Sequence, residues 1–110
     1  MTSFEILELA VMAGNMAVII GASDASLKQQ HVDGDTLLHV AAYYGRAAIL
    51  SFLITRNVDT DALALGHTAL AVVRQKLAEA DTALDLDQYL SCEALLREVT
   101  ADSSLPLLTY

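Results

Sequence analysis

"GDTLLHVAAYYGRAAILSFLITRNVD", residues 34–59, is the stretch that decides the fold. It begins with turn chemistry, because Gly34 permits a positive φ and the aspartates beside it can hydrogen-bond their own backbone. Thr36 stands where a hydroxyl can cap the first turn of a helix. Gly45 is the left-handed residue expected where that helix ends, and Asn57, which tolerates the same geometry, can end a second one. The stretch therefore predicts two short helices joined by a tight turn.

Each of these two helices carries a buried face in the sequence. Leu38, Ala41 and Ala42 form a narrow apolar stripe at helical spacing, and the two small residues allow a neighbouring helix to approach closely. The expected buried face of the second helix consists of Ile49, Leu50, Phe52 and Leu53. Such a helix pair cannot cover its own apolar side, so further units are expected beside it.

The pattern recurs on both sides of the central stretch. The Gly, Thr and Leu of residues 34–39 recur in residues 66–71, and the Leu, Ala and Gly of residues 38–45 have counterparts in residues 7–14. Three units of about one length therefore follow one another along the chain.

Residues 34–59 resemble an ankyrin repeat, whose signature is Gly-x-Thr-Pro-Leu-His-x-Ala-Ala-x-x-Gly followed by an apolar second helix. The match departs from the signature at Leu37, where the family prefers proline. The resemblance implies an all-α ankyrin-repeat solenoid of stacked helix-turn-helix units with short extended fingers between them. It also implies that His39 braces the turn by hydrogen bonding to backbone. We expect a single domain with an N-terminal capping repeat (1–31), a central repeat (32–63), an atypical C-terminal repeat (64–101) and a tail (102–110).

The two outer units depart from the central pattern. Residues 2–5 form a capping-box pattern that starts a helix, and a short second helix near residues 16–20 runs into "GASDAS", a loop composition. In the third unit nothing stops the first helix, so we expect it to continue to about Ala80. Its second helix is expected to carry Leu86, Tyr89, Leu90, Leu95, Leu96 and Val99. Atypical terminal units are expected in a solenoid, because their outer faces have no neighbour.

Composition and charge limit the possible functions. The 110 residues are 55% apolar, contain one proline and carry 14 acidic against six basic side chains, for a net charge of −8. Such a surface repels nucleic acid and anionic lipid, and the longest apolar run, residues 16–22, is too short to span a bilayer. A secretion signal begins with basic residues, whereas no basic residue precedes Lys28 in this sequence. Cys92 is the only cysteine. We therefore expect an intracellular, cytoplasmic protein without a nucleic-acid or membrane partner.

One cluster of histidine and aspartate residues suggests an enzymatic function as an alternative hypothesis. His31, Asp33, Asp35 and His39 lie within nine residues and could serve a metal-dependent hydrolase. Their spacing fits neither an EF-hand loop nor a zincin helix, however, and turn acids with a structural histidine explain the same residues. No nucleophile elbow or phosphate-binding loop is present. The sequence therefore predicts no enzyme, no metal and no cofactor.

The remaining prediction is that the chain binds a partner protein. The resemblance implies docking on a concave surface made by finger tips and by the ends of the first helices. The residues carried over are Met12, Val32, Asp33, Asp35, Tyr43, Tyr44, Leu65, His67, Gln75 and Lys76, together with Ala13 and Ala64. Tyr43 and Tyr44 are the expected anchors, because they follow the packed alanines of their helix and tyrosine is enriched in binding hot spots.

In an alternative hypothesis the chain also binds a partner protein, but by charge rather than through the tyrosines. Seven acidic residues after residue 78 face only Arg97 in sequence, so the chain could be an acidic inhibitor or immunity-type protein that binds a basic partner. Weak salt dependence with sensitivity to tyrosine removal would favour the aromatic surface instead.

Overall fold

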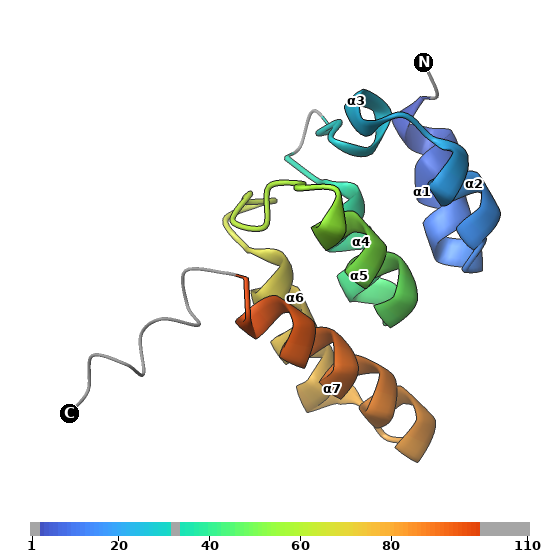
Figure 1. Cartoon of the computed structure of the whole chain (residues 1–110). Coiled ribbons are helices and arrows are strands. Elements are labelled where there is room, and N and C mark those ends of the chain that lie inside the picture. The colour runs from blue at the N-terminus through green and yellow to red at the C-terminus, as the bar shows by residue number, and fades with distance from the viewer. Residues whose placement is uncertain (1–2, 32–33, 100–110) are drawn as a thin grey trace.

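The structure, a computed structural model, describes residues 3–31 and 34–99. Seven helices follow one another in the described residues: α1 (Phe4–Ala13), α2 (Met16–Gly21), α3 (Asp24–Leu27), α4 (Leu37–Tyr44), α5 (Ala47–Thr55), α6 (Ala69–Glu79) and α7 (Ala83–Arg97). The pairs α1/α2, α4/α5 and α6/α7 lie one beside the next, and the segments that lead into α4 and α6 lie on the same side of the stack (Figure 1). The all-α class is as predicted.

The helix boundaries follow from local chemistry. The side chains of Thr36, Thr68 and Thr82 each accept a hydrogen bond from the backbone N–H three residues later, so α4, α6 and α7 begin with the same cap. Gly45 ends α4 at φ 67°, as predicted. The helix α1 begins at Phe4 with Ser3 as its N-cap, one residue after the start that the capping-box pattern predicted.

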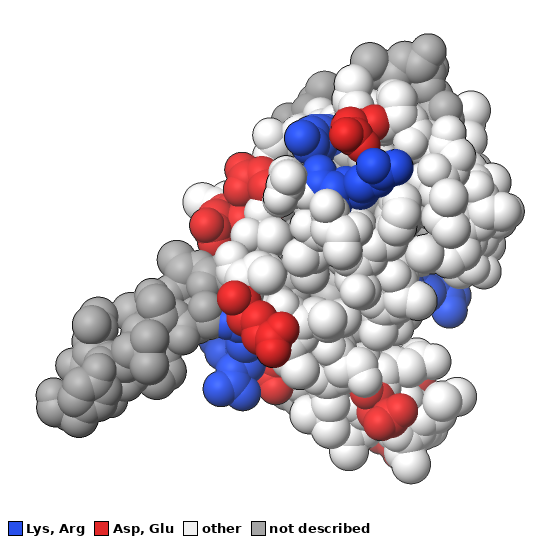
Figure 2. All heavy atoms as spheres, viewed as in Figure 1, with Lys and Arg blue, Asp and Glu red and all other residues white. Residues whose placement is uncertain are grey.

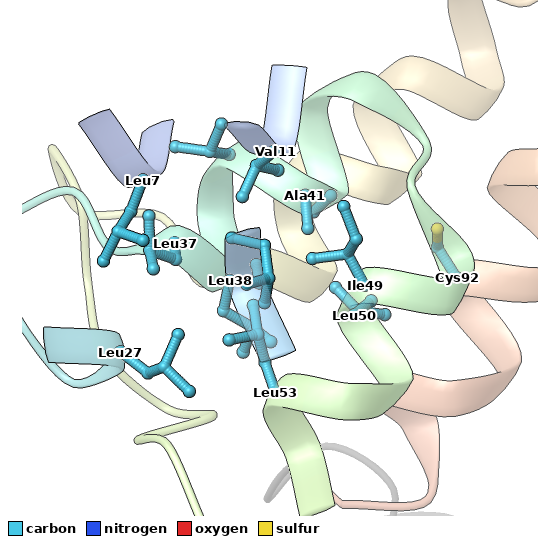
Figure 3. Close-up of a cluster of buried hydrophobic side chains, with 14 of the residues drawn as sticks. Leu7, Val11, Leu27, Leu37, Leu38, Ala41, Ile49, Leu50, Leu53 and Cys92 are labelled. Carbon is cyan, nitrogen blue, oxygen red and sulfur yellow. The ribbon is translucent and has the colours of Figure 1, made fainter. Parts of the chain in front are cut away.

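Helix α4 forms the centre of the core. Its residues from Leu37 to Ala42 are all buried, because α1 and α6 flank the helix and α5 covers it. Side chains from α1, α4 and α5 converge on one cluster that includes Leu7, Leu38 and Leu50 (Figure 3). Each fully buried leucine contributes about 1.5–3 kcal/mol. The predicted stripe of Leu38, Ala41 and Ala42 is therefore correct but too narrow, since an inner helix is enclosed on three sides.

Two details differ from the predictions. The stretch predicted as a loop at residues 21–26 contains α3, whose N-cap Ser23 accepts from Ser26 N–H and whose Leu27 enters the core. The last helix, α7, ends at Arg97 and so does not carry Val99, which the prediction placed on it. Leu96 is buried, whereas Leu86 and Leu90 are exposed, which agrees with the expectation that the outer face of a terminal unit has no neighbour. Leu86 and Leu90 are exposed because α7 packs mainly against α5 and α6, and no described element covers its outer face. The extension of α6 to Glu79 is as predicted.

Candidate functional site

A groove of about 310 Å³ opens where three helices and one finger meet. Glu8 comes from α1, Tyr43 and Tyr44 from the last turn of α4, and Val72 from α6. The finger formed by residues 64–67 closes one side, and Asp35 stands at the entrance to α4. The sequence-predicted residues that line the groove are Asp35, Tyr43, Tyr44, Ala64, Leu65 and His67.

The two tyrosines keep much of their surface in solvent. Tyr43 is 49% and Tyr44 37% exposed, and their rings meet edge to face with centroids 5.0 Å apart. The Lys76 ammonium lies 4.3 Å from the Tyr43 ring centroid and 3.3 Å from Glu79 Oε1. The Tyr89 hydroxyl donates to the Tyr43 carbonyl at 2.6 Å, which satisfies a free carbonyl at the end of α4. Helices α6 and α7 therefore both support the aromatic pair.

His39 is the buried polar residue behind the groove. Its Nε2 lies 2.9 Å from the His67 carbonyl oxygen, and its Nδ1 lies 2.8 Å from Thr36 Oγ1. A carbonyl can only accept, so Nε2 carries the proton and the threonine hydroxyl donates to Nδ1. Thr36 Oγ1 in turn accepts from the His39 backbone N–H at 3.3 Å. The ring thus hydrogen-bonds backbone, as predicted, but that backbone belongs to the next finger; within its own turn the ring bonds the Thr36 side chain instead.

The tip of that finger is a tight turn with an unusual residue. Ala64 and His67 exchange both backbone hydrogen bonds, at 2.9 and 3.0 Å, around Leu65 and Gly66. Leu65 has φ 52° and Gly66 φ 83°, the pattern of a type I′ turn, which prefers Asn-Gly. A leucine in left-handed geometry costs about 1–2 kcal/mol, yet this side chain is 82% exposed. The turn therefore holds a large apolar side chain in water at the groove.

Some predicted site residues lie elsewhere. Met12 is half-buried and its carbonyl accepts from the Arg46 guanidinium, while Gln75 and Lys76 lie on α6 outside the groove lining. Ala13, at the end of α1, is also outside the lining. Val32 and Asp33 fall outside the described residues.

Four lining residues were missed: Glu8, His39, Val40 and Val72. The repeat alignment held a signal for Glu8, because it places this residue on the first helix of its unit at the position that His39 occupies in the next. His39 was assigned to bracing the turn, and Val40 and Val72 stand on helix faces to which the sequence analysis gave no role. Helix packing brings these faces to the floor of the groove.

The residues of the metal hypothesis do not form a catalytic arrangement where they are described. Both ring nitrogens of His39 are engaged in hydrogen bonds, and the His31 ring lies against Phe4, with centroids 5.5 Å apart. Within residues 3–31 and 34–99 no group of three or more His, Cys, Asp or Glu side chains could hold a metal ion. Cys92 is fully buried, and burial raises the pKa of its thiol to about 11, so this cysteine is a poor nucleophile.

Comparison with known proteins identifies the central unit. Residues 33–62 match the family model of the ankyrin repeat. No curated protein and no solved structure matches the chain. The segment that matches the ankyrin repeat is thus the central helix pair, and further helix pairs are stacked on both sides of it. Ankyrin repeats are generally non-catalytic and serve in protein–protein interaction. None of the described helices is long and apolar enough to cross a bilayer.

Proposed function

We propose that this chain is a protein-binding module whose partner occupies the groove, with Tyr44 and Leu65 as apolar anchors and Asp35 and His67 at the polar rim. The observation that carries the proposal is that exposed large side chains from α4 and from the finger line one hollow. Tyrosine is among the residue types that carry most of the binding energy at the centre of many interfaces. The left-handed backbone conformation of Leu65 also supports the proposal, because residues with strained backbones cluster at functional sites.

A protein segment fits the groove better than other kinds of ligand. A volume of about 310 Å³ lies at the lower end of the range for ligand pockets, enough for one or two side chains of a larger partner. Among the described residues, the lining includes two carboxylates and no lysine or arginine, which disfavours phosphates. Tyr43, held by Lys76 and Tyr89, serves in this proposal as a rigid support for Tyr44. Met12, Gln75 and Lys76 then flank the contact.

Affinity capture from the source cells tests the proposal with matched variants. Leu65→Ala and Tyr44→Ala remove the two anchors, while Leu90→Ala removes an exposed leucine of α7 outside the groove. Loss of a hot-spot side chain costs at least about 2 kcal/mol, roughly 30-fold in affinity. We expect the same proteins to be captured by the wild type and by Leu90→Ala and to be lost with both groove variants. Equal recovery with all four proteins contradicts the proposal.

The acidic-inhibitor alternative makes a different prediction about salt. Acidic side chains form separate patches on the face shown in Figure 2 rather than one continuous field, and Asp24, Glu79 and Glu93 already pair with basic residues of the chain. A steep loss of affinity between low and high salt, unaffected by Tyr44→Ala, would favour the inhibitor. Weak salt dependence would favour the groove.

A further inference from the structure

The charge of the groove lining narrows the kind of partner. Glu8 and Asp35 both line it, together with the ring of Tyr44. Glu8 is half-buried in the wall, and its carboxylate forms no hydrogen bond or ion pair with the described residues. A carboxylate in such a position loses part of its hydration without gaining a partner. A cation that entered the groove would restore that interaction.

The aromatic pair already attracts a cation. The Lys76 ammonium lies over the Tyr43 ring, and its charge is offset by Glu79. The ring of Tyr44, which meets Tyr43 edge to face, remains 37% exposed. An aromatic face beside carboxylates is a favourable environment for a guanidinium group, which stacks on rings and pairs with carboxylates in a planar, two-pronged geometry.

We infer that the groove accepts an arginine side chain from an extended segment of the partner protein, with the guanidinium stacked on Tyr44 and paired with Glu8. Arginine suits the site better than lysine, because its planar head is more weakly hydrated and can use the ring and the carboxylate together. Leu65 and Val72 would contact the aliphatic part of the arginine or its neighbour. This inference rests on the proposed function and adds the chemistry of the occupant.

The probe is the capped peptide acetyl-Gly-Arg-Gly-amide, titrated into isotopically labelled full-length chain and followed by NMR amide shifts. The matched probe replaces arginine by citrulline, which has the same shape without the charge. We expect the arginine peptide to shift the amides of Tyr44, Leu65 and Gly66, and the citrulline peptide to bind at least about fivefold more weakly. Shifts spread over α7, or equal binding of both peptides, overturn the inference.

Two charge variants separate the groove from the general acidity of the protein. Glu8→Gln and Glu98→Gln each remove one negative charge, but Glu98 is an exposed residue at the end of α7. We expect Glu8→Gln to weaken the arginine peptide at least about fivefold and Glu98→Gln less than about twofold. Equal effects would mean non-specific attraction and overturn the inference. If the arginine probe fails while partner capture still depends on Tyr44 and Leu65, the inference is wrong and the proposed function stands; if neither depends on the groove, both are wrong.

Discussion

The energetic contribution of the contact between neighbouring fingers can be measured by substituting alanine for each of three glycines. Gly34 and Gly66 each lie two residues before the N-cap of a helix, Thr36 of α4 and Thr68 of α6, and both have positive φ, 92° and 83°. A Cβ at Gly34 would lie 2.6 Å from the Leu63 carbonyl oxygen, whereas a Cβ at Gly66 would meet nothing within 4 Å. Gly21, the last residue of α2, has ordinary helical geometry and open space around it.

The expected costs differ accordingly. Alanine in left-handed geometry costs about 1–2 kcal/mol at either finger, and the contact at Gly34 adds about 1–3 kcal/mol, because backbone must shift to relieve it. We therefore expect Gly34→Ala to lower the free energy of unfolding by about 2–5 kcal/mol and Gly66→Ala by about 1–2 kcal/mol. Gly21→Ala should raise it by up to about 1 kcal/mol, through helix propensity.

Urea unfolding followed by far-UV circular dichroism measures all three variants. The reasoning requires Gly34→Ala to be the most destabilising by a margin beyond experimental error, with unchanged m-values. Equal losses at Gly34 and Gly66 would refute it, because the finger of the central repeat would then not rest against the chain near Leu63.

Three further predictions concern the interior and the finger. In urea unfolding, His39→Ala should lower the free energy of unfolding by about 2–4 kcal/mol and Thr36→Val by about 1 kcal/mol. The double mutant should lose less than the sum, because the two side chains share a hydrogen bond. Additive losses would contradict that bond. Leu65→Asn should raise the thermal midpoint, since asparagine tolerates positive φ, while weakening partner capture; a lower midpoint would remove the strain argument. The Cys92 thiol should react with iodoacetamide only after unfolding. Its pKa in the folded chain, about 11, exceeds the ordinary 9.0, so the free energy of unfolding should fall between about pH 9 and pH 11 in the wild type relative to Cys92→Ala. The same pH dependence in both proteins would contradict the burial of this thiol.

The sequence predicted those features that depend on neighbouring residues. The caps at Thr36 and Gly45 and the extent of α6 follow from side-chain chemistry and from an apolar stripe that is read within one helix. The short helix α3 was not predicted, because four residues are too few to show a helical period and their composition is typical of loops. The positive φ of Leu65 was not foreseen, since leucine rarely occupies such a turn.

Features set by packing between units could not be inferred in this way. The place of Glu8 in the groove depends on how α1 lies against α4. The exposure of Leu86 and Leu90 depends on whether another unit covers α7, and an amphipathic pattern is the same in either case. The tyrosine pair was found because the alanines before it fixed the direction of the packed side.

The His67 carbonyl accepts two hydrogen bonds, one from Ala64 within its own turn and one from the His39 ring of the preceding repeat. One oxygen atom thus joins the rim of the groove to the interior of the molecule. An occupant that immobilises the finger also holds that ring in place, so occupancy and melting become thermodynamically linked. A bound partner should therefore delay thermal separation of the repeats as a unit, and heat should release it in the same cooperative transition.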